Sequence, residues 1–304
     1  MNDMGKVVNT FVVVLPPNPM DDSANQSTTV LIGRAVLLGI FVVLAGTMPR
    51  NLFFALNLRF FASVPWAVPV TGLYLWFFWQ RLKSNDERRR ILRANPLPLR
   101  VWLWALVSGL LGIAVLIVAL HFADRFVALP EQHLPSIAGL PKSTVLTLLL
   151  AAAPIAGIVE ESASRGYMQG PIERRCGLMV AILITGTMFA VVHLDFTVIL
   201  WPYYLAVTAL YGFVTSRTNS ILPAIVLHTI GNVYSNLDLW LHGRAEWQHA
   251  AGTAAHAWSH GAPTELVWLF GGILAMCFAF YKLSRSVHSP AAADIESAYS
   301  KRQE

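Results

Sequence analysis

Three short groups of polar residues lie inside apolar stretches of this chain. They are Glu160-Glu161 with Arg165, Phe189 with His193, and His228 with Asn232. A charged side chain at the centre of a membrane helix costs about 2.5 to 3.5 kcal/mol on insertion scales, so such residues usually serve a function. The sequence therefore predicts that the three groups form one polar site within a membrane.

The spacing within the first group predicts different roles for its two glutamates. On a helix, residues four apart share a face and adjacent residues differ by about 100°. Glu161 and Arg165 are therefore expected to form an ion pair that lowers the cost of burying both charges. Glu160 points elsewhere and remains free for chemistry, the alternative being a second structural carboxylate.

The other two groups also have a spacing of four. Phe189 is expected to pack beside His193. The alternative for His193 is a purely structural role as a hydrogen-bonded core residue. His228 and Asn232 can direct an imidazole N–H and an amide N–H at one point, which is what a developing oxyanion requires. Their structural alternative is a hydrogen bond between helices.

Together these groups could hydrolyse a peptide bond without a covalent intermediate. A carboxylate removed from bulk water is a stronger base, so Glu160 could take a proton from a water molecule. His193 could share or orient that water. His228 and Asn232 would stabilise the tetrahedral oxyanion.

The ordered set of motifs resembles the type II CAAX prenyl endopeptidase and bacteriocin-processing family, known as CPBP or ABI proteases. The resemblance covers residues 143 to 239. It implies a glutamate-dependent intramembrane protease with Glu160 as base, water activation by His193 and oxyanion support from His228 and Asn232. Many members have a bulky aromatic where this chain has Ser164, so we expect a different cavity wall and an effect on substrate choice.

The composition requires a membrane protein. Hydrophobic residues make up 55% of the chain and charged residues only 13%, against about 25% in soluble domains. Apolar runs near the spanning length of about 20 residues occur at 30–48, 53–80, 101–122, 143–165, 178–196, 198–216, 221–239 and 265–283. We predict an all-α bundle of about eight transmembrane helices. The second run contains Arg59, Pro65 and Pro69, so it is either a broken helix or a shorter span after an interfacial segment.

Basic residues collect on alternate loops, which predicts that both termini are cytoplasmic. The basic face holds Lys6, the stretch 81–100, Arg174, Arg175, Arg217, Lys282, Arg285, Lys301 and Arg302, whereas the outer face has Arg50, Arg125, Lys142 and Arg244. Orientation and anionic headgroups account for the net charge of +5, so no nucleic-acid partner is expected. We expect the protein in a bacterial cell membrane.

The chain divides into a cytoplasmic leader at 1–29, one transmembrane domain at 30–283 with its catalytic core at 143–239, and a cytoplasmic tail at 284–304. Cys176 and Cys277 lie near predicted cytoplasmic helix ends, where a disulfide is not expected. The histidines of the loop 240–264 suggest a polar surface loop, with weak metal binding or pH sensing as the alternative.

The expected partners are the lipid bilayer and a membrane-associated peptide or protein, either a prenylated CAAX substrate or a peptide precursor. No cofactor is expected. Two histidines and two glutamates could bind zinc. However, the motif HExxH is absent, and Glu161 is expected to pair with Arg165 and so is not available as a ligand. We therefore predict a metal-independent enzyme. The alternative to an enzyme is a non-catalytic membrane protein, either a transporter or a peptide-binding immunity protein.

Straight helices pose one geometric problem. If the helices at 178 and 221 both begin at the cytoplasmic surface, a rise of about 1.5 Å per residue places His193 about 24 Å deep and His228 about 10 Å deep. Tilt, a late exit of the helix at 143–165, or a different helix start must bring them together.

Overall fold

The computed structural model describes residues 27–82, 90–127, 139–193, 198–242 and 262–287. All regular structure in these ranges is helical, which confirms the predicted all-α membrane bundle. Most of the predicted leader and tail, and most of the histidine-containing loop, lie outside the described residues. The domain division stays a prediction.

The helices correspond one to one with the apolar runs of the sequence. They are α1 (Thr28–Arg59), α2 (Ala67–Leu82), α4 (Leu99–Asp124), the continuous series α5 (Lys142–Glu161), η2 (Ser162–Gln169) and α6 (Gly170–Cys176), then α7 (Leu178–Val192), α8 (Trp201–Thr218), α9 (Leu222–His242) and α10 (Ala262–Val287). Within the described ranges, four helices are long and apolar enough to cross a bilayer: Thr28–Arg59, Leu99–Ala123, Lys142–Cys176 and Pro263–Val287. Ala67–Phe77 and Leu178–Val192 are shorter apolar helices.

The boundary between the first two spans differs from the prediction. α1 continues through Pro49 as far as Arg59, so the start of the run 53–80 belongs to α1 and α2 is a shorter helix. Asn57 fixes the corner between them, because its amide nitrogen donates to the Val64 carbonyl at 2.9 Å and its amide oxygen accepts from the Ala67 N–H at 2.9 Å. The run 53–80 is therefore divided between two helices, and α2 is shorter than the predicted span.

The segment that carries the glutamates is a helix of changing type. α5 passes into η2, a π-helix over Ser162–Gln169, and then into α6. Gly177 ends the series with φ 85°, a left-handed conformation that glycine adopts without strain, and α7 starts at the next residue.

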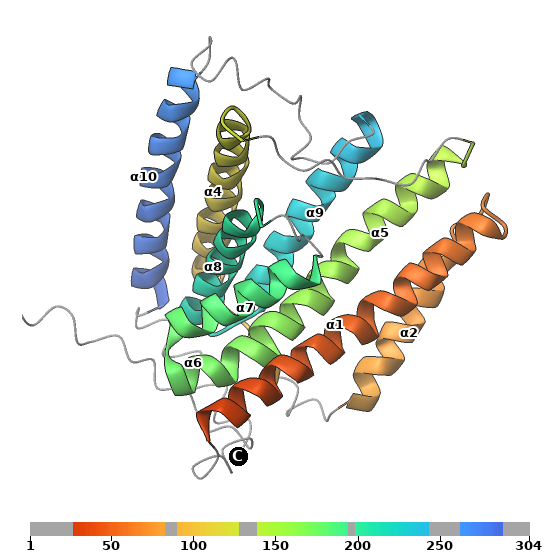
Figure 1. The fold of residues 1–304 in the computed structure, drawn as a ribbon, viewed down its shortest axis with the longest axis horizontal. Coiled ribbons are helices and arrows are strands. Elements are labelled where there is room, and N and C mark those ends of the chain that lie inside the picture. The colour runs from red at the N-terminus through yellow and green to blue at the C-terminus, as the bar shows by residue number, and fades with distance from the viewer. Residues whose placement is uncertain (1–26, 83–89, 128–138, 194–197, 243–261, 288–304) are drawn as a thin grey trace, which may run out of the picture.

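Small residues bring the helices close together, as is usual in membranes. On α1, a Cβ at Gly39 would lie 2.2 Å from Met168 and one at Gly46 would lie 2.4 Å from Val159. α4 likewise packs through Gly109 on Leu227. In Figure 1, α4 and α10 lie side by side at one edge of the bundle, and α1 and α2 at the other.

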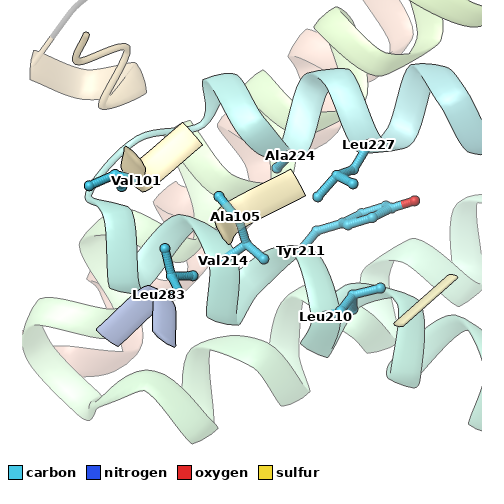
Figure 2. Close-up of a cluster of buried hydrophobic side chains, with 8 residues drawn as sticks. All are labelled: Val101, Ala105, Leu210, Tyr211, Val214, Ala224, Leu227 and Leu283. Atoms are coloured by element: carbon cyan, nitrogen blue, oxygen red, sulfur yellow. The ribbon is translucent and has the colours of Figure 1, made fainter. Parts of the chain in front are cut away.

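A buried cluster joins α4, α8, α9 and α10 (Figure 2). Its members are Val101, Ala105, Leu210, Tyr211, Val214, Ala224, Leu227 and Leu283. Tyr211 and Leu227 are neighbours of the polar site, and Leu227 immediately precedes His228. This core therefore fixes α8 and α9, on which the site is built.

Candidate active site

One cavity of about 300 Å³ lies among α1, α4, α5, α7, α8 and α9. Glu160, His193, His228 and Asn232 all line it. The side chains that the sequence analysis proposed for catalysis thus meet around one space large enough for water and a peptide group. Ser164 is buried in η2 and does not belong to the lining, so it does not form the cavity wall.

The predicted ion pair between Glu161 and Arg165 is present, with 3.2 Å between Arg165 Nε and Glu161 Oε2. Both side chains are 0% exposed. Glu160, in contrast, keeps 17% of its side chain exposed. The two adjacent carboxylates therefore have different surroundings: one is sealed in an ion pair, and the other faces the cavity.

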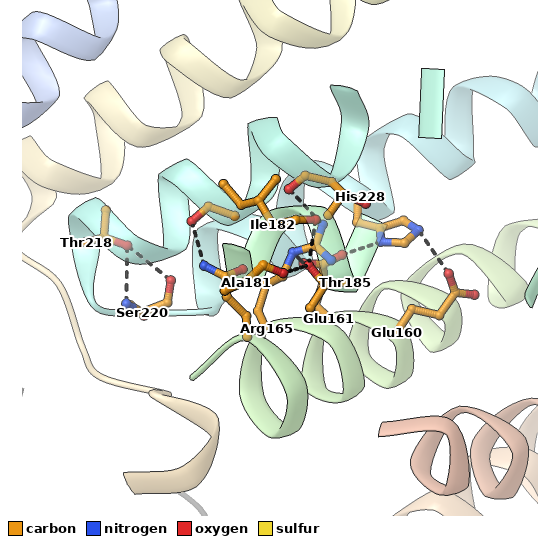
Figure 3. A network of polar contacts seen from close by, with 12 residues as sticks. Glu160, Glu161, Arg165, Ala181, Ile182, Thr185, Thr218, Ser220 and His228 are labelled. Carbon is orange, nitrogen blue, oxygen red and sulfur yellow. Dashed lines mark hydrogen bonds and ion pairs between the residues drawn. The ribbon is translucent and has the colours of Figure 1, made fainter. Parts of the chain in front are cut away.

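His228 connects the two carboxylates (Figure 3). Its Nδ1 lies 2.8 Å from Glu161 Oε1, and its Nε2 lies 3.7 Å from Glu160 Oε2. A carboxylate that is ionised opposite Arg165 only accepts hydrogen bonds, so Nδ1 donates to Glu161. The sequence analysis grouped His228 with Asn232 and did not foresee this link to α5.

Asn232 lies one helical turn beyond His228 and lines the same cavity. In the described part of the protein its side-chain amide makes no hydrogen bond, so both amide donors are available to a ligand. The role of the two residues as an oxyanion pair stays a prediction.

Aromatic rings fix both imidazoles. Tyr204 stacks on His193 with centroids 4.8 Å apart, and Tyr211 stacks on His228 at 5.5 Å. The Phe189 ring lies 4.4 Å from His193 and 6.3 Å from His228 and so bridges the two. The sequence analysis missed both tyrosines, although they are two helical turns apart in α8 and therefore share one face.

His193 has a defined hydrogen bond as well. Its Nδ1 lies 2.7 Å from the carbonyl oxygen of Phe189. Because a carbonyl only accepts, Nδ1 carries the proton in that contact, and Nε2 of the neutral ring is an acceptor.

The long helix also has a regular series of contacts with α8. Arg165 Nη2 donates to the Thr208 carbonyl at 3.5 Å, and Gln169 Nε2 donates to the Gly212 carbonyl at 3.1 Å. One turn further, the Ser216 hydroxyl donates to Glu173 Oε1 at 2.6 Å. We call these three contacts the α8 ladder. They hold α8 in the register that directs its tyrosines at the imidazoles.

His193 and His228 lie near each other in the structure and line one cavity. His193 follows the end of α7 and His228 lies near the start of α9, yet both rings contact Phe189. In Figure 1, α7 runs at a shallower slope than α9. The two histidines thus meet although they lie at opposite ends of their helices, and their depth in a membrane stays a prediction.

One cavity residue differs from its prediction. Arg50 was expected in a loop on the outer face, but it lies within α1 and lines the cavity. Its side of the membrane stays a prediction. For metals, no group of three or more His, Cys, Asp or Glu side chains in the described ranges is arranged to hold an ion.

The fold and this site define a polytopic helical membrane protein with a buried polar centre of acid, base and amide groups. Residues 142–234 match the model of the family described as type II CAAX prenyl endopeptidase Rce1-like. This match supports the CPBP family that the motifs indicated and, in general terms, a CAAX-type intramembrane protease. The matched segment runs from the start of α5 into α9 and includes all three motifs.

No curated protein and no solved structure matches the chain.

Proposed function

We propose that the protein is an endopeptidase that hydrolyses a peptide bond of a membrane-associated peptide or protein with a water molecule activated by Glu160. The observation that carries the proposal is the convergence of Glu160, His193, His228 and Asn232 on one cavity. Both termini are proposed to be cytoplasmic and the membrane bacterial. Prenylated CAAX-type proteins and peptide precursors are the two substrate classes that the family suggests.

Glu160 is suited to be the general base because its carboxylate is accessible from the cavity, unlike that of Glu161. The 3.7 Å between Glu160 Oε2 and His228 Nε2 allows one water molecule to contact both groups. The water oxygen attacks the carbonyl carbon, and its proton passes to Glu160. The same proton then moves to the leaving amine as the C–N bond breaks.

The other residues orient and stabilise. Glu161 holds Nδ1 of His228, which fixes the ring with Nε2 toward Glu160. His193, whose Nε2 accepts, orients the attacking water. Asn232 donates its unoccupied amide to the oxyanion, and it carries the larger share of that role because both nitrogens of His228 face carboxylates.

Replacement of Glu160 by Gln tests the proposal. Purified protein in lipid nanodiscs would be incubated with a library of lipidated peptides, and products would be identified by mass spectrometry. Glu160→Gln should abolish cleavage without changing insertion or the melting temperature, because an amide cannot accept the proton of the attacking water.

The matched control is Glu265→Gln. Glu265 pairs with Arg125 at 2.6 Å, and its side chain is 27% exposed and outside the cavity lining. This control should cleave like the wild type. Full residual cleavage by Glu160→Gln would refute the assignment of the base.

A further inference from the structure

The cavity contains a cation that the proposed chemistry does not use. Arg50 of α1 lines the cavity together with Glu160. Its Nε and Nη2 both donate to Asn51 Oδ1, at 3.1 and 2.9 Å, which orients the guanidinium. Among the described residues no carboxylate forms an ion pair with it.

The position of Arg50 on α1 directs it at α5. Gly46 lies one turn earlier on the same face and packs directly on Val159, the residue before Glu160. Helical side chains lean toward the N-terminus of their helix, so the Arg50 guanidinium reaches back toward the level of Glu160. An electrostatic interaction between Arg50 and Glu160 agrees with this placement.

An arginine inside a membrane span needs an anion, because a charge removed from water is costly when it has no partner. Asn51 supplies only a neutral oxygen. Glu160 does not complete an ion pair with Arg50, and its carboxylate contacts His228 at 3.7 Å. The guanidinium therefore belongs to the lining of the space in which a substrate would lie and has no ion-pair partner among the described residues.

We infer that Arg50 binds a carboxylate of the peptide substrate and is a specificity-determining residue of the cavity. The inference rests on the proposed function for the substrate being a peptide. A planar guanidinium holds a carboxylate through two parallel hydrogen bonds, which distinguishes it from an amide or an ester. Substrates with a carboxylate at this point are bound, and otherwise identical neutral peptides are bound weakly.

The carboxylate lies close to the reacting bond. Arg50 is one turn, about 5.4 Å, beyond the contact of Gly46 with Val159, and it lines the cavity together with Glu160. An extended peptide covers about 3.3 Å per residue. The bound carboxylate therefore belongs to a residue near the scissile bond, either as a free C-terminus or as an acidic side chain.

The test compares capture of three lipidated random pentapeptide libraries by the protein in nanodiscs. One library ends in a free carboxylate, one in a carboxamide, and one in a carboxamide with a glutamate next to the last position. Wild-type protein should retain at least one of the two carboxylate-containing libraries about 10 to 100-fold better than the neutral one. The library that is preferred identifies the source of the carboxylate.

The variants are Arg50→Gln, Arg50→Lys and the control Arg34→Gln. Arg34 lies in the same helix but lines a separate surface groove with Val30 and Phe41. Arg50→Gln should lose the preference, Arg50→Lys should retain part of it, and Arg34→Gln should behave like the wild type. The comparison of libraries on unmodified protein needs no variant, so a misfolded Arg50→Gln protein would not obscure the result.

Equal capture of all libraries by the wild type, including no capture of any, would overturn the inference. For a cleaved peptide, Arg50→Gln should raise KM and leave kcat nearly unchanged. A fall in kcat alone would instead make Arg50 part of the chemical step and overturn its role as an anchor. Capture is measured without cleavage, so carboxylate-dependent capture by a protein that cleaves nothing would reject the proposed function and leave the anion site standing.

Discussion

Replacement of Glu161 by Gln should destabilise the folded protein far more than replacement of Glu160 by Gln. Glu161 and Arg165 are both 0% exposed, and Arg165 Nε lies 3.2 Å from the carboxylate. The neutral amide can still accept from His228, so the main loss is the negative charge opposite a buried guanidinium. Breaking such a pair costs about 3 to 5 kcal/mol, a large fraction of a typical total of about 5 to 15 kcal/mol.

The remaining contacts of Arg165 do not compensate for that loss. Its Nη2 reaches the Thr208 carbonyl at 3.5 Å, and its guanidinium lies 5.6 Å from the Tyr211 ring centre. Neither contact carries a full negative charge. Removing both charges in the double variant Glu161→Gln/Arg165→Gln should therefore restore part of the stability lost in the single variant.

The measurement is thermal and denaturant unfolding in mild detergent, followed by circular dichroism, with cleavage assayed on the same samples. Glu161→Gln should lower the midpoint strongly. Glu160→Gln should leave it near the wild-type value and remove only activity. The reasoning would be refuted if the two single variants were equally stable and equally inactive, because the two carboxylates would then have the same role.

Three further outcomes are expected. Extensively chelated protein should keep its activity, since the proposed chemistry uses only Glu and His; loss of cleavage restored specifically by zinc would favour a metalloprotease. Asn232→Ala should lower single-turnover cleavage about 100 to 1000-fold with little change in binding of an uncleavable analogue, and a proportional loss of binding at an unchanged rate would make the residue a docking element. Gly46→Ala should lower the melting temperature because its Cβ would meet Val159 at 2.4 Å, whereas Gly33→Ala, with nothing within 4 Å, should not; equal effects would contradict this packing.

The sequence predicted those parts of the site that depend on spacing within one helix. The pairing of Glu161 with Arg165 and the contact of Phe189 with His193 follow from four-residue separations and are present. The bond from His228 to Glu161 depends on how α9 crosses α5, and the periodicity of a single helix contains no information about that crossing.

Two other features could not be read from hydropathy. Apolar length does not fix where a span ends, so the sequence placed Arg50 outside a helix that in fact continues to Arg59. The π-helical stretch after Glu161 was predicted as ordinary α-helix, because a local change of winding leaves no distinct composition. Both errors concern the neighbourhood of the cavity, where the structure departs from ideal straight helices.

The π-helix keeps the side chains that form the α8 ladder on the side of their helix that faces α8. Along an α-helix of 3.6 residues per turn, each step of four residues advances by about 40° beyond a full turn, so a row with this spacing spirals away from its neighbour. The wider turn of a π-helix counteracts that drift. Arg165, Gln169 and Glu173 consequently stay in line along α8.

Deletion of one residue from Ser162–Gln169 would restore α-helical winding and rotate α6 relative to α5. The glutamates and the ladder would then no longer face their partners at the same time, so this segment should tolerate substitutions better than any change in its length.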